Sequence, residues 1–148
     1  MLQHMIVRVP FLFALLLLTA FTVWAQSPGT KPIYPIKFKP GANTTVVEST
    51  VSPPMTVGPD MTNEGSERYS LSVQAGQYLT MEISSNNRQA MFSLIKPSPG
   101  MVKYEIVEGA GGVKRWSGRL TQSGDYIITV FTQDREAGSR FKLRVRLR

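Results

Sequence analysis

Few side chains of this 148-residue chain are of the types that do chemistry, and they are scattered along it. The absence of cysteine excludes disulfides, thiolate nucleophiles and cysteine-ligated zinc. The single histidine, His4, precedes the opening apolar run, so without that segment there is no imidazole for a triad or proton relay. Glu105 and Glu108 come closest to the carboxylate pair of a glycosidase. Glu105 lies on the polar side of an alternating segment and Glu108 beside a glycine turn, so we expect both to be surface charges.

No acidic cluster has the spacing of a metal site. Asp134 and Glu136 could offer oxygens to calcium, but calcium takes about six to eight oxygen ligands and the surrounding loop lacks repeated acidic residues. The glycine-rich residues 109–112 lack the lysine and the following helix of a phosphate-binding loop. The sequence therefore predicts no catalytic residue, no metal, no cofactor and no enzymatic activity.

Basic residues are concentrated near the C-terminus of a chain whose formal net charge is +7. In residues 141–147 apolar and basic residues alternate, which predicts a strand with one buried and one cationic face. Protection of an exposed sheet edge would account for this pattern on its own. The functional alternative is an anion-binding strip for an acidic envelope polymer or an acidic protein. Nucleic acid is not expected, because no exposed aromatics are interleaved with the cations. The strip would consist of Arg140, Lys142, Arg144, Arg146 and Arg148.

A second group of polar residues lies in the motif W-x-G-x-L-x-x-S-G-D-Y-x-I-x-V at residues 116–130. Gly124 permits a tight turn there, so Ser123 and Asp125 flank it between two expected strands. One interpretation has Tyr126 buried at the start of the second strand. In the other, Ser123 and Tyr126 project toward a partner, since loops on a rigid sandwich commonly carry binding. Alternation alone does not decide between the two.

The elements that must position these residues are predicted to be strands. Short alternating segments separated by Gly- and Pro-rich turns recur from residue 36 onward, and none has the 3.6-residue apolar period of a helix. Residues 69–73 and 79–83 are expected to pair as a hairpin around the turn at 75–76. The pattern predicts an all-β antiparallel sandwich or jelly roll of about eight or nine strands.

The chain is expected to be exported and to carry one domain. Residues 1–25 are typical of a signal peptide, with Arg8, an apolar run and small residues at the cleavage site. The run falls short of the ~20 residues of a membrane span, so none should remain after cleavage. Residues 26–35 are predicted to be a Pro-rich linker and residues 36–148 the sandwich domain. The expected location is periplasmic or secreted, and an exposed sheet edge would allow a homodimer.

Three blocks of sequence occur in an order shared by two related groups of proteins. They are Ile36-Lys37-Phe38 with Gly41, Y-x-L-x-V-x-A-G-Q at residues 69–77, and the motif at 116–130. In these blocks the chain resembles the bacterial pre-peptidase C-terminal domain, a β-sandwich that accompanies secreted enzymes. It also resembles the periplasmic inhibitors of invertebrate-type and goose-type lysozymes, which are small stand-alone proteins with a signal peptide.

The resemblance to the inhibitors implies a non-catalytic protein whose partner is a lysozyme. In the invertebrate-type inhibitors a Ser-Gly-x-Tyr loop enters the lysozyme cleft, which here would be Ser123 and Tyr126, with Gly124 shaping the loop and Asp125 between them. The serine hydroxyl can hydrogen-bond a catalytic carboxylate while tyrosine fills a sugar subsite. The resemblance to the other group implies an accessory domain that binds carbohydrate, a cell-envelope polymer or another protein.

Overall fold

The computed structural model describes residues 31–54, 65–97 and 105–148, which contain eight strands and no helix. The expected signal peptide lies outside these residues. No helix long and apolar enough to cross a membrane occurs in the described ranges. The strands are β1 (Ile33–Pro35), β2 (Thr44–Val51), β3 (Glu67–Val73), β4 (Tyr78–Ser85), β5 (Ala90–Ile95), β6 (Arg115–Arg119), β7 (Gly124–Thr132) and β8 (Ser139–Leu147).

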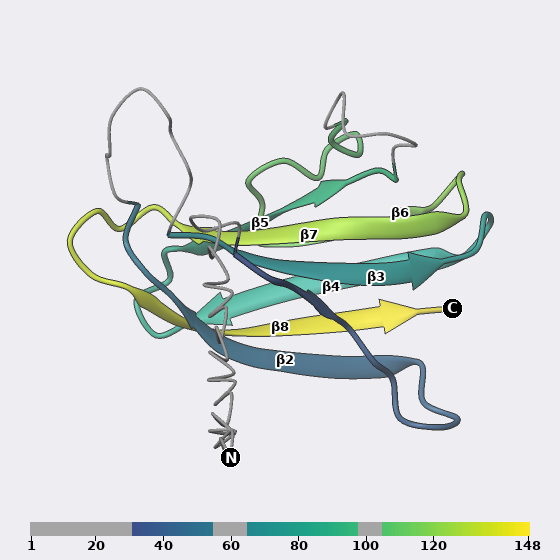
Figure 1. The fold of residues 1–148 in the computed structure, drawn as a ribbon, viewed down its shortest axis with the longest axis horizontal. Coiled ribbons are helices and arrows are strands. Elements are labelled where there is room, and N and C mark those ends of the chain that lie inside the picture. The colour runs from purple at the N-terminus through teal and green to yellow at the C-terminus, as the bar shows by residue number, and fades with distance from the viewer. Residues whose placement is uncertain (1–30, 55–64, 98–104) are drawn as a thin grey trace, which may run out of the picture.

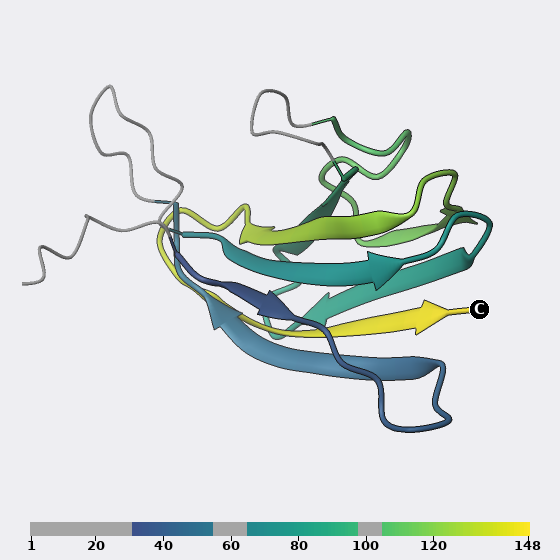
Figure 2. The ribbon, with the colours of Figure 1, turned by 45° about the vertical axis from the view of Figure 1, so that its right-hand side comes forward.

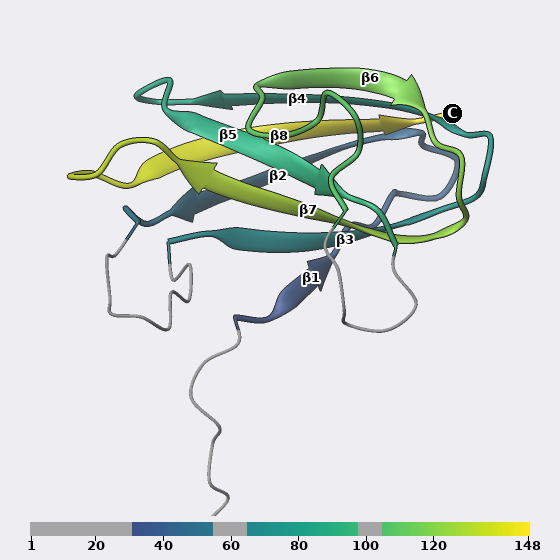
Figure 3. The same cartoon turned by 90° about the horizontal axis from the view of Figure 1, so that it is seen from above.

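The strands form two four-stranded sheets that pack face to face (Figures 1 and 2). Sheet A has the order β1-β3-β7-β5, and sheet B has the order β2-β8-β4-β6. Seen from above, β1 and β6 lie at opposite sides of the molecule (Figure 3). Every pair is antiparallel except β1 with β3, which is parallel. The predicted all-β sandwich is confirmed, with this one parallel pair added.

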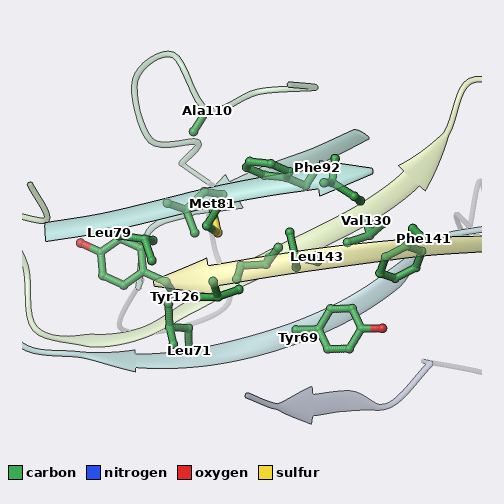
Figure 4. Packing of buried hydrophobic residues seen from close by; sticks show 14 of the residues in the cluster. Tyr69, Leu71, Leu79, Met81, Phe92, Ala110, Tyr126, Val130, Phe141 and Leu143 are labelled. Carbon is green, nitrogen blue, oxygen red and sulfur yellow. The ribbon is translucent and has the colours of Figure 1, made fainter. Parts of the chain in front are cut away.

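The core lies between the sheets because alternate residues of each strand are apolar and point inward (Figure 4). On β7 and β8 the buried positions fall at every second residue, as the sequence pattern indicates. Large side chains from both sheets are almost completely removed from solvent, which is the main source of stability for a domain without cysteine. The largest of them are Tyr126, Phe92, Phe141, Leu71, Leu79, Met81, Leu94, Leu120, Ile128 and Leu143.

The expected hairpin between β3 and β4 is wrong, although both strands are present. β3 pairs with β7 in sheet A, whereas β4 pairs with β6 and β8 in sheet B. The turn between them, closed by a 3.2 Å hydrogen bond from Gln77 N to Gln74 O, carries the chain from one sheet to the other. Two strands that each have one buried face can pair side by side or face each other across a core, and here they face each other.

The N-terminal edge of sheet A includes residues that the sequence places in the linker. Ile33–Pro35 pairs with β3 in parallel, and Lys31 Nζ lies 3.4 Å from Glu67 Oε1. Ile36 donates its backbone N–H to Ser70 O at 2.8 Å, and with Phe38 it packs against the core. The sandwich therefore begins a few residues before the expected boundary.

A buried polar chain ties the loop between β7 and β8 to the turn between β4 and β5. Thr132 and Ser139 are buried, with their hydroxyl oxygens 2.7 Å apart, and Ser139 Oγ donates to Asn87 Oδ1 at 2.8 Å. Asn87 Nδ2 donates to Asp134 Oδ2 at 3.2 Å, and Asp134 Oδ1 accepts the backbone N–H groups of Glu136 and Ala137, each at 2.9 Å. Because its polar atoms are paired, this network holds the loop without the cost of unsatisfied buried groups.

Asp134→Asn is expected to make the free energy of unfolding depend less on pH in the acid range. The N–H groups of Ala137 and Glu136 lower the pKa of the Asp134 carboxyl. A group whose pKa is lower in the folded state stabilises fully above its unfolded pKa, and that contribution is lost as pH falls through the folded pKa. Denaturant unfolding across the acid range should show a shallower dependence in the variant, with Glu136→Gln as the control of equal charge change. Identical acid profiles for both variants would contradict this role.

Candidate functional site

At one end of the sandwich the β3–β4 turn and the β6–β7 loop are joined by hydrogen bonds (Figure 1). Gly76 N donates to Leu120 O at 2.7 Å, and Leu120 N donates to Gln77 O at 2.8 Å. Ala75 N donates to the side-chain oxygen of Ser123 at 2.8 Å. We refer to residues 74–77 and 120–125 together as the loop end. These bonds fix its shape before any partner binds.

Among the residues that define the motif, Ser123 and Asp125 are the exposed ones. The Ser123 oxygen accepts from Ala75 N, which sets its position. Its own O–H has no acceptor within the described ranges. Asp125 pairs through its backbone register with Ser72 on β3, and its carboxylate forms no ion pair with any described residue. The loop end therefore presents the Ser123 hydroxyl as an oriented donor, together with the Asp125 carboxylate.

Gly124 joins the loop to β7 in a conformation that suits glycine. Its φ is +137°, and a Cβ built on it would lie 2.9 Å from the Cβ of Pro97. Both the backbone angle and this close approach exclude an unstrained larger residue. Gly124 thus fixes the path of the chain between Ser123 and the first buried residue of β7.

Tyr126 is that buried residue, and its side chain is only 1% exposed. Figure 4 shows its ring among the core side chains, beside Leu71 and Leu79. Its hydroxyl donates to Gln122 O at 3.2 Å, which ties the loop to the core. The ring does not project with Ser123, so in this conformation it is not available to fill a sugar subsite of a partner. Of the two interpretations of Tyr126, the structure shows the buried one.

The basic strand is central in its sheet, not at an edge. β8 pairs with β2 on one side and β4 on the other, so its backbone needs no charged protection. Edge protection is therefore wrong as an explanation of its cations. Alternation places them all on the outer, solvent-exposed face of sheet B. We call Arg140, Lys142, Arg144, Arg146 and Arg148 the basic row.

Acidic partners of the basic row are confined to its middle. Lys142 Nζ lies 2.9 Å from Glu48 Oε1 on β2. Glu82 on β4 is hydrogen-bonded to Arg115, which lowers the pKa of the Glu82 carboxyl, and Arg144 lowers it further through its charge. The remaining members of the row form no ion pair with a carboxylate of the described chain. They are Arg140, Arg146 and Arg148.

An exposed tyrosine lies between two arginines where the basic row meets the loop end. Tyr78, 43% exposed, is paired with Arg119 of β6. On its other side it exchanges backbone hydrogen bonds with Arg148, at 2.8 and 3.0 Å. Arg119 Nη1 donates to Gly76 O at 2.7 Å, which anchors that guanidinium beside the β3–β4 turn. The sequence pattern predicted the basic row but not Tyr78 or Arg119, because only the pairing of β4 with β6 and β8 brings them to it.

The two glutamates considered as a catalytic pair make separate structural contacts. Glu105 forms an ion pair with Lys96, and Glu108 uses its backbone oxygen to accept from Trp116 Nε1 at 3.1 Å. Both are exposed. Within the described residues no three His, Asp or Glu side chains gather as metal ligands. Residues 109–112 lie along β5, where Leu94 N donates to Ala110 O at 2.9 Å.

Comparison with known proteins finds similarity in structure and not in sequence. No family model matches the chain, and no curated protein is significantly similar to it. Its fold is similar to that of PliG of Aeromonas hydrophila, a periplasmic inhibitor of g-type lysozyme, with a TM-score of 0.57, 22% identity and coverage of 78% of this chain and 96% of that one. PliG of Salmonella Typhimurium gives a TM-score of 0.54, 16% identity and coverage of 80% and 100%.

The second group is also represented among the structural neighbours. The pre-peptidase C-terminal domain of a Bacillus anthracis collagenase has a TM-score of 0.48 and 11% identity, with coverage of 81% of this chain and 100% of that one. At these identities the likeness shows a shared β-sandwich fold.

Proposed function

We propose that this chain is an exported, non-catalytic protein that inhibits a g-type lysozyme by binding it with the loop end. The observation that carries the proposal is the match to two periplasmic inhibitors of g-type lysozyme over 96% and 100% of their lengths. The sequence motif adds support, since the serine, glycine and tyrosine of the loop in the invertebrate-type lysozyme inhibitors, which the sequence resembles, have counterparts here.

Ser123 is the residue that contacts the catalytic carboxylate of the enzyme in this proposal. Its oxygen is held by Ala75 N, and its O–H remains to donate to a carboxylate such as those with which glycosidases act. A hydrogen bond to a charged acceptor is stronger than one between neutral groups. Because hydrogen bonds between its two segments already fix the loop end, little conformational entropy is lost on binding.

Tyr126 takes a supporting part in this proposal. Its buried ring and its hydroxyl bond to Gln122 hold the loop from below, while Ser123 and Asp125 form the contact surface. Asp125 can accept hydrogen bonds from the rim of the enzyme cleft. The other function implied by the sequence, an accessory carbohydrate- or protein-binding domain, stays a prediction.

The proposal is tested by adding the purified protein to lysozymes of the goose, invertebrate and chicken types and following lysis of cell walls by turbidity. We expect inhibition of the goose type. Ser123→Ala should weaken it about tenfold or more, the effect of losing a hydrogen bond to a charged group. Ser84→Ala is the matched control, because Ser84 is another exposed serine and lies near the end of β4 away from the loop end; this variant should inhibit like the wild type. Failure to inhibit any of the three lysozymes would refute the proposal.

A further inference from the structure

The basic row places a line of positive charges along an inner strand of sheet B. Neither packing nor pairing of the strands requires these charges. Outward side chains on a strand lie about 7 Å apart, so the row forms a line of charge about 27 Å long. Like charges at this spacing repel one another, and carboxylates compensate only its middle. Because β8 is paired on both sides, the repulsion is not offset by protection of an edge.

Several small hydroxyl side chains lie beside the row on β2 and β4. In register with Arg146 lie Thr44 on β2 and Thr80 on β4, and Ser117 Oγ donates to Thr80 Oγ1 at 3.3 Å. Near the loop end the row is joined by Tyr78, whose exposed ring lies between Arg148 and Arg119. Cations, hydroxyls and one exposed aromatic ring together suit a ligand that carries anionic groups, hydroxyls and a C–H face.

We propose that the outer face of sheet B is a second binding surface, for a linear polysaccharide that carries carboxylate or phosphate groups. The polymer runs along β8, its anionic groups pair with Arg144, Arg146 and Arg148, and one sugar ring lies on Tyr78. This surface is separate from the loop end, and the inference does not rest on lysozyme inhibition.

The arrangement favours a narrow polymer over a membrane surface. Glu48 and Glu82 flank the row on β2 and β4, so a planar anionic surface would approach both carboxylates as well as the cations. A polymer along β8 lies between them. Membrane adsorption also draws on apolar side chains that insert among lipids, and the large exposed hydrophobics on this face are Val46 and Tyr78 alone among the described residues.

The experiment measures binding of polygalacturonate, a carboxylate-bearing polysaccharide, by calorimetry at low salt, with neutral pullulan for comparison. The double variant Arg146→Gln/Arg148→Gln leaves no carboxylate unpaired, because neither arginine has an acidic partner in the described chain. The control, Lys37→Gln/Arg135→Gln, removes two exposed cations outside the strands. Tyr78→Ala tests the aromatic contact. Unfolding midpoints of all variants are measured alongside.

Binding of polygalacturonate and not pullulan is expected, with about a tenfold loss and a shallower salt dependence in the row variant, as for other polyanions. The control should lose less than about twofold, and Tyr78→Ala should weaken binding of polygalacturonate but not of polyglutamate. Equal losses in the two double variants would overturn the proposal, since net charge alone would then explain binding. Tighter binding of phosphatidylglycerol vesicles or single-stranded DNA, or no binding of polygalacturonate, would also overturn it. None of these results depends on lysozyme.

Discussion

Replacing Tyr126 by alanine is expected to lower the free energy of unfolding by about 3–5 kcal/mol, the cost of truncating a buried aromatic residue. The ring is 1% exposed and lies in the core between the sheets. Tyr126→Phe keeps the ring and loses only the bond from the hydroxyl to Gln122 O, so it should cost about 1 kcal/mol. Urea denaturation followed by circular dichroism measures both values.

The same pair of variants separates support of the loop from contact with a partner. Tyr126→Phe should inhibit lysozyme nearly as well as the wild type, because the ring still fills the core and Ser123 keeps its bond to Ala75 N. If Tyr126→Ala instead abolished inhibition while leaving stability within about 1 kcal/mol of the wild type, the ring would have to act at the surface. That result would contradict the placement of Tyr126 in the core.

Gly124→Ala is expected to destabilise the protein by about 1–3 kcal/mol for the strained backbone angle, with a further loss from contact with Pro97. The added Cβ meets the Pro97 Cβ at 2.9 Å, so the start of β7 or Pro97 must move. Movement of β7 displaces Ser123, and inhibition should fall by more than the loss of folded protein explains. Denaturation and the turbidity assay on the same samples measure the two effects.

Gly41→Ala is the control for that prediction. Gly41 also has a positive φ, +76°, but a Cβ there has no atom within 4 Å. It should therefore show the cost of the backbone angle without that of a close contact, and it should leave inhibition intact. Equal destabilisation by the two substitutions would mean that the contact between Gly124 and Pro97 does not constrain the loop.

The sequence predicts the strands well because each has one buried face, and burial of alternate residues is a local property. β3, β4, β7 and β8 all lie where alternation places them. Alternation does not indicate which strand is the hydrogen-bonding neighbour. A core-facing position is apolar whichever strand its backbone pairs with. The expected hairpin of β3 with β4 failed for this reason.

The candidate sites show the same limit. The turn chemistry of Gly124 located the loop, but the direction of Tyr126 depends on the register of β7 with β3, where Tyr126 pairs with the buried Leu71. The cations of β8 were visible as a pattern, and their central position was not, because an edge strand and a central strand in a sandwich have the same alternation. Tyr78 joins Arg148 and Arg119 only through strand pairing between distant parts of the chain.

The position of β8 also determines when the protein can fold. Within sheet B, β2 pairs with β8 alone, and β4 and β6 are linked to β2 only through β8. A nascent chain that lacks Ser139–Leu147 thus has no means of closing this sheet, whatever its earlier segments have formed. Pairings between segments so far apart in sequence also form slowly. We therefore expect the sandwich to reach its native state only after β8 has been synthesised, with the earlier strands unable to complete the sheet until then.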